Sequence, residues 1–365
     1  SSDRRRMLAK SVSKNHYPAP YALIDLWAKY ADDSKTMLAE EAKSVARLVV
    51  GDTAQNLIRV FFLQEKMKAL GRDSDFKARH VHVVGAGVMG GDIASWCALQ
   101  GLNVTLQDQS PERLAPAMKR AYGLFKKRLK KPLLIQAAMD RLSPDVHGLG
   151  LKHADVVVEA IFENVEAKQN LFRELESKVG PDTLLATNTS SIPLEEICKV
   201  LPQPERLVGL HFFNPVAKMQ LVEIVKGSQT DETVASHAAS FARQINRLPM
   251  PVKSSPGFLV NRILMPYLLE AVVMESEGVK AELIDKAAVE FGMPMGPIEL
   301  ADTVGLDICL SVADILSKSM DINVPDRLRS MVKASRLGRK SGRGFYEYKK
   351  GKPVKSKLGK DVFKP

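Results

Sequence analysis

Cysteine is scarce in this chain of 365 residues, which contains only Cys97, Cys198 and Cys309. An odd number of widely separated thiols does not fit a disulfide framework, and none of the three has the spacing of a metal-ligand motif. We therefore expect reduced thiols, no zinc site and a cytosol-like compartment. In a bacterium that compartment would be the cytoplasm. The alternative is that the chain comes from a longer protein of a peroxisome or a mitochondrion.

Long apolar runs are also missing. The longest, residues 258–274, is interrupted by Asn261, Arg262 and Glu270, so it is too short and too polar to span a bilayer. Residues 1–6 contain neither an initiator methionine nor an apolar signal core, so we expect a fragment of a longer protein. With 45% hydrophobic and 26% charged residues, the composition is globular and suits about two domains.

Acidic residues are outnumbered, 42 against 53 basic residues, which gives a net charge of +11. Such a balance suits nucleic acid, a membrane surface or a polyanionic small molecule, and charge alone does not choose among them. Several lysines crowd into residues 349–355. We interpret this segment as a solvated tail that inflates the total.

The apolar pattern divides the chain into four segments. Residues 1–75 predict helices, with a break at Gly51 in the helical stretch 34–70. Over residues 76–255, short β-branched runs alternate with helical segments, which indicates a Rossmann-type doubly wound α/β domain. Its strands are expected at residues 81–84, 104–106, 156–158, 184–186 and 207–210. An all-helical domain is expected over 256–350 and a basic tail over 351–365.

A glycine-rich loop follows the first strand of the predicted sheet. Gly85, Gly87 and Gly90 have the spacing of a dinucleotide-binding turn and open the helix that begins near residue 88. The helix N-terminus would then face a pyrophosphate. Asp108 lies 18 residues beyond Gly90 (108 minus 90), at the end of the next strand, where a carboxylate can accept hydrogen bonds from ribose hydroxyls. No arginine follows directly, so the pattern favours NAD over NADP.

Polar side chains follow two later strands. Asn188 and Ser190 come directly after the run 184–186, and His211 ends the run that begins at residue 207. Glu223 lies in the strand-like run that follows. Because ligands of open α/β sheets bind at the carboxyl edge, these side chains predict an imidazole, a carboxylate and hydrogen-bond donors beside the cofactor.

These motifs closely resemble the L-3-hydroxyacyl-CoA dehydrogenase family, and especially the dehydrogenase part of the multifunctional α-subunits of fatty-acid β-oxidation. The likeness covers about residues 79–348. It rests on residues 85–90, 158–164, 188–191, 211–215, 256–262 and 294–297, which occur in the family's order.

The resemblance implies that His211 is the general acid/base and that Glu223 orients its ring and stabilises its charged form. A histidine suits this role because its side chain changes charge near neutral pH. Ser190 and Asn261 would hydrogen-bond the substrate oxygens and the imidazole region. The cofactor-lining set would be Gly85, Gly87, Met89, Gly90, Asp108, Ile161, Phe162, Glu163, Lys168, Asn188, Ser190 and Asn214.

Each functional assignment has a structural alternative. His211 could be a hydrogen-bonded core histidine, Asn261 could cap a helix, and Lys168 could belong to an exposed helix face. For the whole chain, one alternative is another Rossmann oxidoreductase that uses a lysine on the first helix of its second domain, where this sequence offers Asn261 and Arg262. The other is a non-enzymatic module, although His211 and Glu223 are both present.

One residue departs from the family pattern. The glycine loop usually continues with a small residue, whereas this chain has Asp92 after Gly91. A carboxylate that faced the pyrophosphate would weaken NAD binding. We therefore predict that Asp92 points away, in which case Asp92→Gly would bring no large gain in NAD affinity.

The resemblance also has implications for the parent protein. In the multifunctional relatives an enoyl-CoA hydratase/isomerase domain precedes this region, so residues 1–75 are expected to be the helical linker and the chain itself to lack hydratase activity. Monofunctional relatives dimerise, which predicts a homodimer through residues of about 258–320 or an exposed apolar face. An acyl-CoA is the expected substrate, association of the parent protein with a thiolase is expected, and nucleic acid is not.

Overall fold

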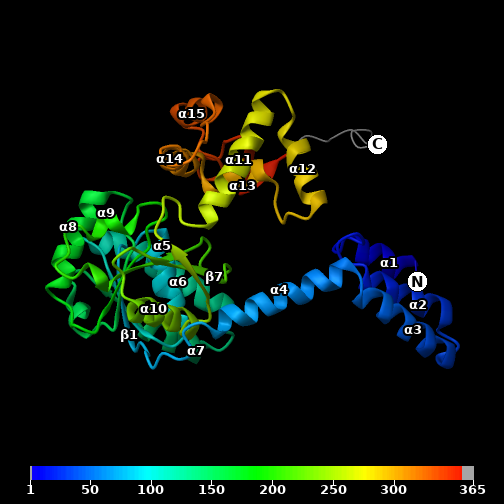
Figure 1. The fold of residues 1–365 in the computed structure, drawn as a ribbon, viewed down its shortest axis with the longest axis horizontal. Helices are drawn as coiled ribbons and strands as arrows, with labels where there is room; N and C mark the ends of the chain where they lie inside the picture. Colours follow the sequence, from blue (N-terminus) through cyan, green and yellow to red (C-terminus); the bar gives the residue numbers. More distant parts are fainter. Residues whose placement is uncertain (1, 356–365) are drawn as a thin grey trace. The chain divides into compact units, whose positions relative to one another are not determined.

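The computed structural model describes residues 2–355 and divides into two compact units, one ending at Ala69 and the other beginning at Leu70 (Figure 1). Residues 356–365 of the predicted basic tail lie outside the described residues. The first unit is helical. Its elements are α1 (Ser2–Ala9), α2 (Ala19–Tyr30), α3 (Ser34–Val49) and α4 (Asp52–Ala69).

Local chemistry explains the boundaries of α3. The Asp33 side chain accepts a hydrogen bond from the Thr36 backbone amide, 3.1 Å away, and so caps the helix N-terminus. Gly51 separates α3 from α4, as the sequence predicts. Tyr21 on α2 is buried, and its hydroxyl donates to the Val12 carbonyl.

An eight-stranded sheet forms the centre of the second unit, in the order β3-β2-β1-β4-β5-β6-β7-β8. All neighbouring strands are parallel except β6 and β7, which are antiparallel. The strands are β1 (His80–Val84), β2 (Asn103–Gln107), β3 (Leu142–Asp145), β4 (Val156–Glu159), β5 (Leu184–Thr187), β6 (Leu207–Phe212), β7 (Leu221–Lys226) and β8 (Leu248–Lys253). The prediction of a mainly parallel, doubly wound sheet is confirmed.

Helices cover both faces of the sheet (Figure 1). One face packs on α5 (Val88–Leu99), α6 (Pro111–Arg128), α7 (Pro132–Asp140) and α10 (Glu232–Gln244). The other packs on α8 (Val165–Glu176), α9 (Leu194–Cys198) and the short helix Leu149–His153. Central strands such as β4, Val-Val-Val-Glu, are buried throughout because both faces are covered.

Within the described residues five α-helices follow the sheet. They are α11 (Val260–Ser276), α12 (Ala281–Phe291), α13 (Pro297–Val304), α14 (Leu306–Leu316) and α15 (Asp326–Lys333). Four of them, α11, α13, α14 and α15, pack around one apolar core, and α12 packs against α11 and α13 in a smaller one. The prediction of a helical second domain is confirmed. Of the described residues, none belongs to a helix that is both long and apolar enough to cross a bilayer.

The lysine-rich segment after the helices differs from the expected solvated tail. Two short strands, β9 (Glu347–Lys349) and β10 (Lys352–Val354), form an antiparallel pair. The Asp302 carboxylate, buried on α13, accepts hydrogen bonds from the backbone amides of Phe345 and Tyr346. The tail prediction is therefore wrong for residues 351–354, because the preceding segment is attached to the helical core and positions the pair of strands.

Candidate active site

The carboxyl ends of β1, β2, β4, β5 and β6 lie at one edge of the sheet because these strands are mutually parallel. Every cofactor residue predicted from the sequence, Lys168 excepted, lies at this edge, in a loop or in the first turn of α5. The loops are residues 85–87 after β1, 108 after β2, 161–163 after β4, 188–190 after β5 and 214 after β6, and Met89 and Gly90 belong to α5.

The glycine loop after β1 is tight everywhere except at its centre. A Cβ on Gly85 would lie 2.6 Å from the Ala160 carbonyl oxygen, and a Cβ on Gly90 would lie 1.9 Å from the Gly85 carbonyl oxygen. Gly85 also has φ +105°, a conformation that favours glycine. A Cβ on Gly87, in contrast, would meet nothing within 4 Å. The open side at Gly87, at the N-terminus of α5, fits the close approach of a pyrophosphate.

Asp108 is held beside this loop by backbone amides. Its Oδ2 accepts from Ala86 N and its Oδ1 from Gln109 N, each at 2.7 Å. The side chain of Arg113 lies 4.0 Å away and is itself two-thirds exposed. A carboxylate oxygen can accept more than one hydrogen bond, so Asp108 retains capacity for the ribose hydroxyls of a dinucleotide.

Asp92 is directed toward α6. Its Oδ1 lies 3.5 Å from the Arg120 guanidinium, on the side of α5 that packs against α6. The Arg120 Nη2 also donates to the Gly87 carbonyl at 2.8 Å. The carboxylate thus has a cationic partner within the protein.

Glu163 organises the loop after β5. Its Oε1 accepts hydrogen bonds from the Thr189 hydroxyl at 2.6 Å and the Ser190 backbone amide at 2.9 Å. Burial would raise the pKa of Glu163, but the charge of Lys168 and these hydrogen bonds outweigh it and hold the pKa below its usual value. The carboxylate is therefore ionised when it holds Ser190 in position.

Lys168 is buried and does not line the surface at this edge of the sheet. Its side chain is only 1% exposed, and its Nζ lies 2.6 Å from Glu159 Oε1 and 3.4 Å from Glu163 Oε2. The Thr187 hydroxyl donates to the other oxygen of Glu159. Lys168 therefore supports the site from the protein interior. It pairs with Glu159 at the end of β4 and with Glu163 in the loop that follows.

His211 and Glu223 face each other on antiparallel neighbours. The two residues are paired in the register of β6 and β7, so their side chains emerge on the same face of the sheet. His211 Nδ1 lies 2.6 Å from Glu223 Oε2, and the Glu223 side chain is fully buried. The rings of Phe213 and Phe258 flank the imidazole at centroid distances of 4.5 and 5.7 Å. The pair is thus a short, buried hydrogen bond beside apolar rings.

The start of the helical domain completes this cluster. The backbone amides of Leu259 and Val260, at the N-terminus of α11, donate to Glu223 Oε1 at 3.0 and 2.9 Å. The Asn261 amide donates to the Ser190 carbonyl at 3.1 Å. Asn261 therefore does not cap α11, whose capping residue is Leu259. Residues of the sheet and of the helical domain therefore meet in one cluster around His211.

The remaining predicted residues surround the cluster. The Asn188 side chain accepts a hydrogen bond from the Phe212 amide at 2.9 Å, which ties the loop after β5 to the end of β6. Asn214 is exposed and precedes a cis peptide bond to Pro215. Met89 and Ile161 are partly buried, and Phe162 is 70% exposed. These side chains leave accessible surface along the sheet edge.

Sequence reasoning missed several residues that hold the site. Glu159 ends a buried apolar strand, and an acid at such a position requires a partner, which could have identified it. Arg120 lies on an exposed helix face, and nothing in its sequence environment distinguishes it from Lys119. The amides of Leu259 and Val260 are backbone groups, whose positions depend on the packing of two domains.

A doubly wound sheet with a glycine loop after its first strand and a histidine–carboxylate pair at its carboxyl edge is typical of the class of NAD-dependent oxidoreductases. Residues 80–255 match the NAD binding domain of 3-hydroxyacyl-CoA dehydrogenase, and residues 257–348 match the C-terminal domain of the same enzyme. The chain belongs to the 3-hydroxyacyl-CoA dehydrogenase family. The fold class, enzyme class and NAD cofactor predicted from the sequence are confirmed.

Curated relatives are longer than this chain. The fatty acid oxidation complex subunit alpha of Pseudomonas savastanoi pv. phaseolicola is 37% identical over 367 residues, which cover 96% of this chain and 51% of the relative. The protein of that name from Shewanella baltica is 35% identical, with 96% and 52% covered. The chain therefore spans about half the length of the curated relatives it matches.

Solved structures of similar proteins include one shorter and one longer enzyme. The (S)-3-hydroxybutyryl-CoA dehydrogenase from Ralstonia eutropha is 37% identical with a TM-score of 0.70, covering 75% of this chain and all of that chain. The 3-hydroxybutyryl-CoA dehydrogenase from Escherichia coli is 34% identical with a TM-score of 0.71, covering 79% and 63%.

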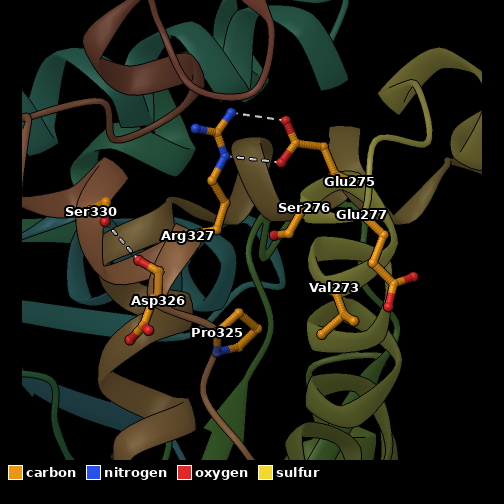
Figure 2. Close-up of a pocket in the computed structure, with 8 residues that line it drawn as sticks. All are labelled: Val273, Glu275, Ser276, Glu277, Pro325, Asp326, Arg327 and Ser330. Carbon is orange, nitrogen blue, oxygen red and sulfur yellow. Dashed lines mark hydrogen bonds and ion pairs between the residues drawn. The ribbon is translucent and has the colours of Figure 1, made fainter.

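A pocket of about 590 Å³ lies elsewhere in the helical domain (Figure 2). It is lined by the C-terminal part of α11 and the start of α15, where Arg327 forms two hydrogen bonds with Glu275 at 2.9 and 3.0 Å. None of the residues predicted from the sequence to bind cofactor or substrate lines it. This ion pair ties α11 to α15, and we assign the pocket no part in the chemistry.

Proposed function

We propose that this chain oxidises L-3-hydroxyacyl-CoA to 3-ketoacyl-CoA with NAD, using His211 as general acid/base and Glu223 as its partner. The observation that carries the proposal is the 2.6 Å hydrogen bond between His211 Nδ1 and Glu223 at the carboxyl edge of the NAD-binding sheet. An acyl-CoA substrate follows from membership of the family.

The hydrogen bond determines which imidazole atom is available. Glu223 accepts two backbone N–H groups at Oε1, so it serves as an acceptor for His211 as well; Nδ1 then carries the proton, and Nε2 is left to accept the proton of the substrate hydroxyl. Bound NAD supplies the acceptor for the hydride that leaves the same carbon. As His211 becomes positively charged, the Glu223 carboxylate stabilises it, and the rings of Phe213 and Phe258 exclude water.

Other residues hold the two substrates. Ser190, kept in position by Glu163, and Asn261 would hydrogen-bond the substrate oxygens near the imidazole. Asp108 would accept the ribose hydroxyls, and the open side of the loop at Gly87 would receive the pyrophosphate. The further cofactor contacts that we propose are Gly85, Met89, Gly90, Ile161, Phe162, Glu163, Asn188 and Asn214, whereas Lys168, predicted from the sequence as a contact, is buried and supports Glu163 instead.

The decisive experiment measures NADH oxidation with acetoacetyl-CoA by the wild-type chain and by His211→Ala. Loss of the general acid/base should lower kcat by about a thousandfold. His147→Ala, which removes an exposed histidine on a loop remote from this cluster in the sequence, is the matched control and should retain wild-type activity. Equal activity of His211→Ala and the wild type would exclude His211 as the acid/base.

The longer relatives suggest further activities for a parent protein. We propose that a full-length form also hydrates enoyl-CoA and associates with a thiolase, and that residues 1–75 connect the dehydrogenase to the hydratase. This proposal rests on two facts about the relatives: they are named fatty acid oxidation complex subunit alpha, and they are about twice as long as this chain. The chain itself should not hydrate crotonyl-CoA, and measurable hydration by the pure chain would contradict this.

A homodimer through residues of about 258–320 is also proposed. Ile263 on α11 and Phe291 at the end of α12 are 67% and 87% exposed, which leaves apolar surface on the helical domain. Light scattering should give twice the chain mass, and a monomer would overturn the proposal. We expect no nucleic acid partner.

A further inference from the structure

Arg120 on α6 contacts two parts of the cofactor-binding turn at once. Its Nη2 donates to the Gly87 carbonyl at 2.8 Å, and its Nε lies 3.5 Å from Asp92 Oδ1. Gly87 is the capping residue of α5, and Asp92 follows within the first turns of the same helix. One guanidinium therefore joins the loop that would hold the pyrophosphate to the only carboxylate of that helix.

Close packing of α5 against α6 makes this contact possible. A Cβ on Gly91 would lie 2.7 Å from Arg120 Nη2 and 2.9 Å from Ala117 Cβ. Only a glycine allows α6 to approach closely enough for the guanidinium to reach the Gly87 carbonyl. Gly91, which is not part of the dinucleotide-binding pattern, thus has a role of its own in this arrangement.

Electrostatics gives the contact a consequence for the cofactor. A pyrophosphate at the N-terminus of α5 is attracted by the helix amides and dipole, and a carboxylate in the first turns of the helix opposes that attraction. Burial raises the pKa of Asp92, and the positive charge of Arg120 counteracts the rise. The cation of Arg120 and the anion of Asp92 thus offset each other beside the phosphate-binding turn.

We propose that Arg120 is a positioning residue for NAD: it holds the Gly87 carbonyl and neutralises Asp92, so that the glycine loop binds a pyrophosphate despite the added carboxylate. Arg120 does not touch the cofactor in this proposal. Its effect is on cofactor affinity and not on the hydride or proton transfer, and it rests on NAD binding by residues 80–255 rather than on the role of His211.

The test is a double-mutant cycle on the full chain, with the dissociation constant of NADH measured by fluorescence titration. Arg120→Met should weaken NADH binding about tenfold, because it releases the Gly87 carbonyl and leaves the charge of Asp92 in α5 uncompensated. Asp92→Asn alone should change the constant by about twofold or less, and the double variant should recover most of the loss. Lys119→Met removes a neighbouring exposed cation from the same helix and is the matched control, expected to bind like the wild type.

The turnover number separates a positioning effect from a general structural one. At saturating NADH and acetoacetyl-CoA, all four variants should keep kcat within about twofold of the wild type, since only cofactor affinity changes. Equal weakening by Arg120→Met and Lys119→Met, or no recovery on adding Asp92→Asn, would overturn the proposal. If Arg120→Met does not fold, Arg120→Gln replaces it and should show the same loss and the same recovery.

Discussion

The proposed cofactor half and the proposed catalytic half of this site are built in different ways. The cofactor half comes from one domain and from backbone geometry: a glycine loop, the N-terminus of α5 and Asp108, held by amides close to it in space. The catalytic half joins His211 and Glu223 of the sheet to the N-terminus of α11 in the helical domain. Substitutions in the first half should change cofactor affinity, and those in the second should change turnover.

After His211→Ala, Glu223→Gln should produce the largest effect on turnover. The amide keeps the shape of the carboxylate but removes the charge that stabilises the imidazolium, so kcat should fall by about a hundredfold or more, while NADH affinity stays unchanged. Steady-state assays with acetoacetyl-CoA measure the first quantity and fluorescence titration the second. Glu232→Gln, an exposed residue on α10, is the matched control. A variant that loses NADH affinity instead of turnover would break the division between the two halves.

Asp302→Asn tests how far the catalytic half depends on the packing of the helical domain. Asp302 is buried and accepts hydrogen bonds from two backbone amides and the Tyr348 hydroxyl. An amide in its place presents N–H groups to these donors, so the free energy of unfolding should fall by about 1–3 kcal/mol at neutral pH. Urea unfolding measures this, and no loss of stability would contradict it.

The same substitution has a predictable pH dependence. Burial raises the pKa of Asp302 above its usual value of 3.8, although the hydrogen bonds from Tyr346 and Phe345 lower it. A raised pKa in the folded state favours the protonated acid, so its stabilising contribution is complete below 3.8 and is lost as the pH rises through the folded-state pKa. The stability gap between wild type and Asp302→Asn should therefore be larger at pH 4 than at pH 7. A gap that widens with increasing pH would contradict the direction.

Gly87→Ala tests whether the cofactor approaches the open side of the glycine loop. A methyl group here meets no protein atom, so thermal stability should be unchanged, but it would occupy the open side of the loop. NADH affinity should fall about tenfold with little change in kcat. Gly123→Ala, on α6 and also without near neighbours, is the control and should leave affinity unchanged. Wild-type affinity of Gly87→Ala would show that the pyrophosphate does not approach this position.

Arg327→Met should have the smallest effect. Its ion pair with Glu275 is partly exposed, and solvent screening limits such a pair to about 1 kcal/mol or less of folding free energy. Neither kcat nor NADH affinity should change, because the pair lies in the pocket between α11 and α15 (Figure 2). Denaturant unfolding and the standard assay provide the check. A change in turnover would link this pocket to the active site.

The two halves also differ in how well the sequence predicts them. The glycine loop and Asp108 are predictable because each lies within a short segment whose spacing reflects one backbone geometry. His211 and Glu223 are paired through strand register, which the apolar pattern alone does not specify. The amides of Leu259 and Val260 and the guanidinium of Arg120 act across elements that only tertiary packing brings together.

The strands of the sheet also differ in how well the sequence predicts them. Its buried central strands are predictable from their β-branched runs, but the edge strands β3 and β8 were missed. β3 contains Pro144, and β8 contains Pro249 and Pro251. Proline lacks a backbone donor, so such runs are poor candidates for strands, although edge positions tolerate them. Both strands lie at the edges of the sheet.

The contact of Glu223 with the amides of Leu259 and Val260 bears on how the protein could be recombined with its relatives. Pro256 and Gly257 look like a natural junction for exchanging the helical domain, because the chain turns there between two compact cores. Yet the next few residues donate to the carboxylate that serves His211 and contact Ser190. A chimera joined after Asn261 would inherit an intact active site, whereas one joined at Pro256 would take part of that site from another protein.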